Sequence, residues 1–185
     1  MKDPFEEDRF LGNLHSFPPI LHARASLSFD INPDSLQKAL VSALSSLREN
    51  PISRRISVAD RAGYSDGTAH FKVGIGNGEA FDILDVKEEE RVLDHIENRG
   101  AFDSLDLALH IHYRIEDGLS HKVHEDHYIV RLVFEPGRLE ALIHHQKGIR
   151  RIDPSELLGL IIHRLNAKLA REGFPTVSLD LVTST

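Results

Sequence analysis

Residues 105–115 read Leu-Asp-Leu-Ala-Leu-His-Ile-His-Tyr-Arg-Ile, with a large apolar residue at every odd position. Successive side chains of a β-strand point to opposite faces, so this alternation predicts a strand with one buried face. A polar loop is predicted over 117–125, and a second alternating stretch follows at 127–135. Pro136-Gly137 then turns the chain into a third stretch, 138–143. These stretches predict an antiparallel meander.

A similar unit precedes this meander. Residues 21–31 alternate as a half-buried strand, and the pair Asn77-Gly78 is a strong signal for a hairpin turn. The strands predicted around that turn are residues 54–61, 69–75 and 80–84, with a second turn at 62–67. Residues 177–181 predict a short closing strand.

Three main helices are predicted near residues 33–49, 86–98 and 154–172. Each begins with a residue that caps helix N-termini, namely Asn32, Asp85 and Asp153. Proline follows the first and third caps, where the missing N–H costs nothing. Each helix then carries apolar residues at helical spacing.

The predicted order is therefore βα-βββ-α-βββ-α-β, an α+β fold of antiparallel meanders with three main helices. At 185 residues the chain is long enough for one substantial core and short for two. We predict an N-terminal arm over residues 1–20 and a single α+β domain over residues 21–185. The arm contains five large apolar residues among acids, ending at Pro18-Pro19.

Composition narrows the classes of function. The chain has no cysteine, which excludes a disulfide scaffold, a thiolate zinc site and a cysteine nucleophile. The N-terminus is too acidic for a signal peptide, and the apolar stretches are too short to cross a bilayer. We therefore expect a cytoplasmic protein without membrane contact.

Charge is distributed unevenly along the chain. The net charge is −7, but residues 136–185 contain 7 Lys/Arg against 5 Asp/Glu, a local charge of +2. Broad electrostatic capture of nucleic acid is therefore not favoured, although a basic patch can still bind a phosphate group. The densest basic cluster is Lys147, Arg150 and Arg151, just before the helix predicted at 154.

The twelve histidines include several that share one predicted sheet face. A two-residue turn at 136–137 pairs Arg131 with Leu142 and residue 129 with His144. On the preceding hairpin we predict His110 beside Arg131 and His112 beside residue 129. The face opposite the apolar one then carries His110, His112, Arg114, His127, Arg131 and His144.

Two kinds of site fit this face. His110 and His112 project to the same side about 7 Å apart, and with His144 they form a candidate site for a divalent metal such as zinc. Arg114 and Arg131 would repel a cation, which favours an anion instead. The candidate ligand-binding residues are Arg114, His127, Arg131, Lys147, Arg150 and Arg151. A solvated face or a subunit contact also fits the pattern.

The leading hypothesis is a binding or assembly protein that forms a homo-oligomer and needs no cofactor. Its His/Arg face would contact a partner, a small anionic ligand or nucleic acid. The alternative is a metal-dependent hydrolase-type enzyme that uses the histidines. Enzymes of that type usually need a general base beside the metal, and no carboxylate is clearly placed for that role. Whether the protein is an enzyme therefore stays open.

Overall fold

A computed structural model describes residues 11–57, 63–115 and 124–185. Within them the helices and strands are, in chain order, β1 Ala23–Ser28, α1 Pro33–Glu49, β2 Ile52–Ser57, β3 Tyr64–Gly76, β4 Phe81–Ile83, α2 Val86–Arg99, β5 Ser104–Ile115, β6 His124–Glu135, β7 Arg138–Lys147, α3 Pro154–Arg171 and β8 Ser178–Ser184. This order and these helices confirm the predicted α+β fold.

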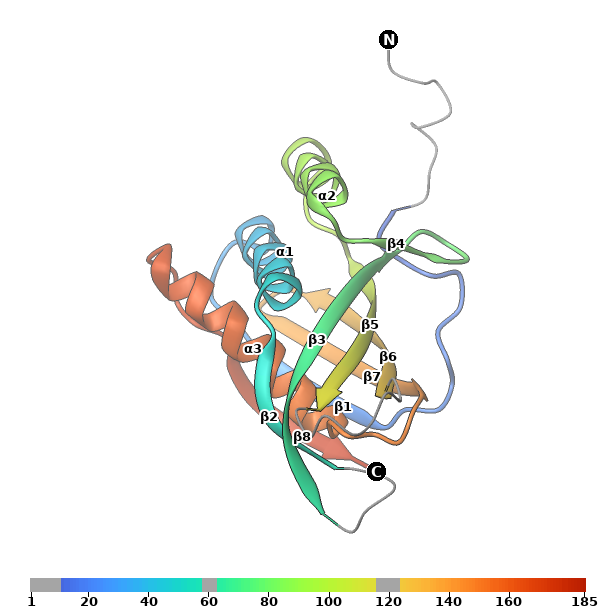
Figure 1. Ribbon diagram of the computed structural model, residues 1–185. Helices are drawn as coiled ribbons and strands as arrows, with labels where there is room; N and C mark the ends of the chain where they lie inside the picture. The colour runs from blue at the N-terminus through green and yellow to red at the C-terminus, as the bar shows by residue number, and fades with distance from the viewer. Residues whose placement is uncertain (1–10, 58–62, 116–123) are drawn as a thin grey trace.

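The strands form one sheet in the order β2-β3-β5-β6-β7-β1-β8, and β4 pairs with β3 beside this path. Every neighbouring pair is antiparallel. Helices α1 and α3 pack against each other on one face of the curled sheet, and α2 lies beside α1 (Figure 1). We call the opposite face the open face.

The helices begin where the caps predict. The side chain of Asn32 accepts a hydrogen bond from Asp34 N at 2.8 Å, and Asp85 accepts one from Glu88 N at 2.9 Å. Asp153 accepts from Ser155 N at 2.9 Å in the same way. Each bond satisfies a backbone N–H that has no partner inside its helix.

The turn predicted at residues 62–67 is wrong, because β3 already begins at Tyr64, which pairs with Ser57. Asp66 and Gly67 resemble turn residues but lie inside this strand. A Cβ on Gly67 would collide with the backbone oxygen of Arg114 and the side chain of Ile56. Glycine is therefore needed here because the neighbouring strands approach closely.

The predicted register between β5 and β6 is also wrong, by four residues. His110 lies opposite His127, and His112 lies opposite Glu125. The prediction treated 117–125 as loop, whereas β6 starts at His124 and is longer at that end; residues 116–123 lie outside the described part. The register between β6 and β7 is as predicted, with Arg131 opposite Leu142.

A segment before β1 runs along the open face (Figure 1). Where β3 and β5 separate, Gly12 N donates to Gly76 O at 2.6 Å and Asp106 N donates to Gly12 O at 2.7 Å. Within the predicted arm, Gly12 is thus hydrogen-bonded to both β3 and β5. Residues 1–10 of that arm lie outside the described part.

The apolar stripe of α3 gives a test of the core. Leu165 is 2% exposed and packs into the main cluster, whereas Leu181 on β8 is 61% exposed. We expect Leu165→Ala to lower the free energy of unfolding by about 2–5 kcal/mol, because the lost methyl groups leave a cavity. Leu181→Ala should change it by less than about 0.5 kcal/mol. Urea unfolding of both variants measures the difference, and equal effects would contradict this orientation of α3.

Candidate functional site

The register of the sheet places a row of basic side chains across four strands of the open face. Lys72 on β3 lies opposite His110 on β5, His110 lies opposite His127 on β6, and His127 lies opposite Lys147 on β7. Side chains directly opposite one another on the same face have Cβ atoms about 5 Å apart. A second row runs beside the first, from His70 on β3 to His112 on β5 and Glu125 on β6.

We call these residues the histidine cluster: His70, Lys72, His110, His112, Glu125, His127 and Lys147. All of them are half-buried or exposed. The rings of His110 and His127 stack nearly parallel, with their centroids 3.9 Å apart and their planes 13° apart. At the edge of the cluster, His70 Nε2 and Thr68 Oγ1 are 3.1 Å apart and form a hydrogen bond.

Burial and neighbouring positive charge both act on the histidines. Desolvation lowers the pKa of His110, and the nearby His127, His112 and Lys72 lower it further. Desolvation also lowers the pKa of His112, with Lys72 acting in the same direction, while Glu125 opposes the shift in both rings. Both imidazoles therefore carry less positive charge at pH 7 than a free histidine does, and they take up protons at lower pH.

Glu125 is the carboxylate within the cluster. Its Oε1 lies 2.7 Å from Lys147 Nζ, and its Oε2 lies 3.4 Å from His127 Nε2 and 3.9 Å from His112 Nδ1. The hydrogen bond from Lys147, with His127 next, lowers the pKa of Glu125 to about 2. His127 Nε2 is buried and makes no hydrogen bond of normal length, because 3.4 Å is an ion-pair distance.

Arg131, a predicted ligand-binding residue, is held by a carboxylate of the fold. It binds Asp106 through two hydrogen bonds, Nε to Oδ1 at 2.8 Å and Nη2 to Oδ2 at 2.7 Å. Asp106 is fully buried and also accepts from Leu14 N at 2.7 Å, while Arg131 lies over the ring of Phe17 at 4.9 Å. The pair therefore fastens the segment before β1 to the open face.

The structure does not bring the three predicted metal ligands together. His144 lies opposite Ile129, which itself lies opposite Ala108, so His144 is in a different row from His110 and His112. Its Nδ1 forms a hydrogen bond with Ile20 O at 2.7 Å. Within the described ranges, no group of three His, Asp or Glu side chains is arranged to hold a metal ion.

The remaining predicted ligands fall into two places. Arg114 is exposed on the open face, beside the second row and opposite Thr68. Arg150 and Arg151 lie in the loop between β7 and α3, where Arg151 Nη2 donates to His124 Nδ1 at 2.8 Å and lies 5.5 Å over the ring of Tyr113. Arg150 Nη2 donates to Thr185 O at 3.1 Å.

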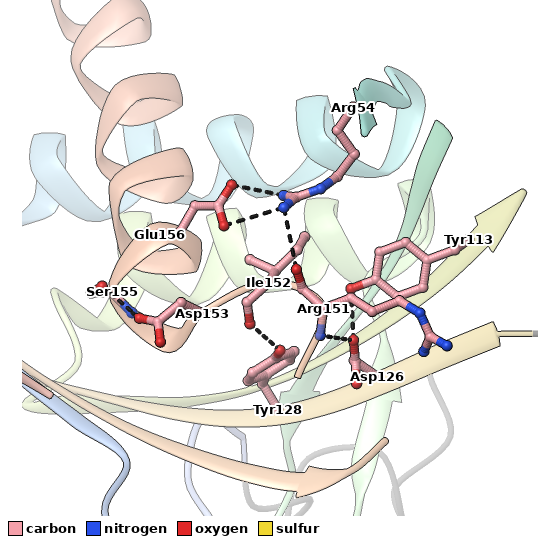
Figure 2. Close-up of polar contacts among 9 residues, drawn as sticks. All are labelled: Arg54, Tyr113, Asp126, Tyr128, Arg151, Ile152, Asp153, Ser155 and Glu156. Carbon is pink, nitrogen blue, oxygen red and sulfur yellow. Dashed lines mark hydrogen bonds and ion pairs between the residues drawn. The ribbon is translucent and has the colours of Figure 1, made fainter. Parts of the chain in front are cut away.

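That loop is organised by the carboxylate of Asp126, which is 0% exposed and faces the helices. Asp126 accepts hydrogen bonds from the Tyr113 hydroxyl at 2.8 Å and from Arg151 N at 2.8 Å (Figure 2). It also accepts one from Arg150 N at 2.9 Å. His145 Nε2 lies 3.4 Å away. Beside it, the Tyr128 hydroxyl donates to Ile152 O.

The backbone of the loop is shaped to surround this carboxylate. Arg150 has a φ of 57°, the left-handed region that non-glycine residues rarely adopt, and this lets two consecutive N–H groups point at one anion. Gly148 has a φ of 103°, and a Cβ there would collide with Asp126 Oδ1. The backbone N–H groups of Arg150 and Arg151, which could have bound an external anion, thus bind the protein's own Asp126 carboxylate.

Both tyrosines of this centre act as hydrogen-bond donors. Burial raises the pKa of Tyr113 far above its usual value, and the negative charge of Asp126 raises it further. Burial and Asp126 raise the pKa of Tyr128 in the same way. The hydroxyls therefore stay protonated. Their hydrogen bonds to Asp126 and to Ile152 O join the sheet to the loop before α3.

Sequence reasoning missed Lys72 and His70 on β3 and the two carboxylates at the start of β6, Glu125 and Asp126. The β3 residues are found only once the pairing of β3 with β5 is known, because 38 or more positions separate them from His110 and His112. Glu125 ends the predicted loop 117–125, and Asp126 lies between that loop and the predicted strand 127–135. One available signal was the opposite charge of Asp106 and Arg131, which would have given the correct register.

Comparisons with known proteins do not identify a family for this chain. No protein-family model matches the chain, and no curated protein and no solved structure matches it at a significant level. None of the helices in the described ranges combines the length and the apolar character that crossing a bilayer requires.

The pair of Asp106 and Arg131 makes a testable contribution. We expect Asp106→Ala to lower the free energy of unfolding by about 2 kcal/mol or more, since Arg131 loses its counter-ion and Leu14 N loses its acceptor. Hydrogen exchange of the Leu14 amide should accelerate as well. Asp103→Ala, at an exposed aspartate beside β5, is the control. Unchanged exchange at Leu14 would contradict the role assigned to Asp106.

The Asp126 network gives a second test. Asp126→Ala leaves two backbone N–H groups and the Tyr113 hydroxyl without an acceptor, so we expect it to cost about 3 kcal/mol or more. Tyr113→Phe removes one donor only and should cost about 1 kcal/mol. Urea unfolding compares the two. A smaller loss for Asp126→Ala than for Tyr113→Phe would show that this carboxylate does not organise the loop.

Proposed function

We propose that this protein is a binding protein that takes a small anionic ligand on the histidine cluster of its open face. The observation that carries the proposal is the row of Lys72, His110, His127 and Lys147 across four neighbouring strands, with His70 and His112 beside it. Six nitrogen-bearing side chains thus share two neighbouring rows with one carboxylate, Glu125, and three of them, Lys147, His127 and His112, lie within 3.9 Å of it. Side chains of this type donate hydrogen bonds and positive charge to phosphate, sulfate or carboxylate groups.

A rigid sheet supports such a site. Cross-strand pairing fixes the spacing of the rows, and the opposite face of the same strands is packed by buried residues such as Leu109, Ile111 and Val130. Donors that are held in place before binding lose little conformational freedom on binding. The sheet therefore favours the cluster as a binding surface over a merely solvated face.

A small anion suits this surface better than nucleic acid. The chain as a whole carries a net charge of −7, which repels a long polyanion. Within the cluster, the lysines contribute two positive charges at neutral pH and Glu125 removes one. Protonation of imidazoles adds positive charge locally, where a small ligand would sit.

The proposal predicts that acid strengthens binding. An anion that prefers protonated imidazoles raises their pKa on binding, so affinity must rise as pH falls toward the pKa of the free protein and level off below it. Because burial lowers the pKa of His110 and His112, the rise should continue below about pH 6.5. For each proton taken up, Kd should fall by up to about tenfold per pH unit above that pKa.

Sulfate is the suitable probe, because its charge is constant between pH 8 and 5, whereas a phosphate monoester titrates near pH 6. Titrations at pH 8, 6.5 and 5 at constant ionic strength, followed by the NMR signals of the imidazole rings, would measure Kd. We expect the double variant His110→Gln with His112→Gln to remove most of the pH dependence, because these are the two rings whose pKa is lowered. His163→Gln, on the exposed side of α3, should bind as the unaltered protein does.

Other outcomes would overturn the proposal. A zinc titration that tightens as pH rises would instead support a metal site, because imidazole coordinates only when it is neutral. If the histidine cluster is a contact between copies of the chain, light scattering should show an oligomer that loosens at pH 5. If sulfate does not bind, or if its Kd changes neither with pH nor in the histidine variants, the histidine cluster is only a solvated sheet face.

A further inference from the structure

We infer that Glu125 is a built-in competitor of the histidine cluster: its carboxylate occupies the position where an external anion binds, and the ligand must displace it. This inference rests on the proposed function and concerns the regulation of the same site. At neutral pH the Glu125 carboxylate would occupy the site whenever no ligand is bound. Its charge would determine which anions can displace it.

The contacts of Glu125 identify the position. Three basic side chains from three different strands converge on its two oxygens: Lys147 at 2.7 Å, His127 at 3.4 Å and His112 at 3.9 Å. A carboxylate that gathers donors from three strands marks the place where negative charge is best stabilised on this face. An external anion gains most from the same donors, so it and Glu125 compete for one position.

Glu125 can leave this position, whereas the neighbouring Asp126 cannot leave its own. Asp126 is 0% exposed and accepts two backbone N–H groups as well as the Tyr113 hydroxyl. The side chain of Glu125 is 27% exposed, and that of its closest partner, Lys147, is 62% exposed. An exposed ion pair of this type is worth about 1 kcal/mol or less, so a ligand with more charge can replace it.

The chemistry of the competitor points to the class of ligand. A tetrahedral dianion, such as sulfate or a phosphate monoester, carries twice the charge of the Glu125 carboxylate. It also has further oxygens, which can meet Lys72 and His110 on the far side of His127. A monocarboxylate offers the cluster no more than Glu125 already does. We therefore expect the site to prefer dianionic oxyanions over acetate-like ligands.

A lower pH should make it easier for an external anion to displace Glu125, because imidazoles become charged while the charge of Glu125 stays the same. Its pKa of about 2 keeps this carboxylate ionised throughout the range from pH 8 to 5. The charged and titratable groups near it are Lys147 on β7, His127 on β6, and His112 and His110 on β5. Lys72 and His70 on β3 lie opposite His110 and His112. As His110 and His112 gain protons, a single internal carboxylate no longer balances the positive charge of the cluster.

The test compares two variants that remove the same charge from the same face. Glu125→Gln keeps the size of the side chain but removes the competing charge. Glu140→Gln is the matched control, because Glu140 on β7 also pairs with a cation of the open face, Arg24, in a row without these histidines. Both variants change the net charge by one unit, so general electrostatics affect them equally.

We expect Glu125→Gln to bind sulfate about fivefold more tightly than the unaltered protein at pH 6.5, the factor that corresponds to loss of a competing ion pair worth about 1 kcal/mol, and Glu140→Gln to stay within about twofold. Glu125→Ala should behave as Glu125→Gln does, which guards against an amide that keeps the old contacts. Acetate, titrated in parallel, should bind the unaltered protein much more weakly than sulfate. Thermal unfolding of each variant confirms that it is folded before titration.

The two proposals fail in different ways. If the unaltered protein binds sulfate with the expected pH dependence but Glu125→Gln binds no more tightly than Glu140→Gln, the competitor role is wrong and the anion site stands. If Glu125→Gln binds more weakly, Glu125 is a ligand-binding group and the inference is reversed. If neither the unaltered protein nor Glu125→Gln binds sulfate at any pH, both proposals fall.

Discussion

The fully buried carboxylate of Asp126 is the constraint on which the closure of this fold depends. A charge that is removed from water must be matched by donors, or the folded state loses several kcal/mol. Here the donors come from β5 and from the loop after β7. That requirement explains the glycine at 148 and the left-handed backbone of Arg150, and it brings the chain to the start of α3, which covers the sheet.

Two consecutive residues of β6, Glu125 and Asp126, have different roles. Because side chains alternate across a strand, Asp126 points to the helices and Glu125 points to the open face. Both carboxylates have partners within residues 147–151. Asp126 accepts from the backbone N–H groups of Arg150 and Arg151, whereas Glu125 pairs with the exposed side chain of Lys147. The same local sequence thus supplies a permanent anion inside the core and, as we propose, an exchangeable one on the surface.

Capping residues, turn residues and apolar periodicity were sufficient to predict the helices and most strands, but not the register between every pair of strands. The caps at Asn32, Asp85 and Asp153 set the helix starts, and the turn at Pro136-Gly137 set the register of β6 with β7. The longer connection between β5 and β6 left that register open, because many loop lengths satisfy the same alternation. A pairing error of four residues preserved the face on which His110 lies but exchanged its neighbour from His127 to Arg131.

The sequence by itself determined the order of helices and strands, the helix starts, the buried faces of β1, β5, β6 and β7 and the concentration of histidines on the other face, since all of these follow from short-range periodicity and capping. Only the tertiary structure decided which histidines meet, that Arg131 is held by Asp106, that His144 bonds the backbone of Ile20 and that Glu125 lies among the basic side chains. Those contacts join residues far apart in the chain, and their geometry depends on strand order and register, which periodicity does not encode.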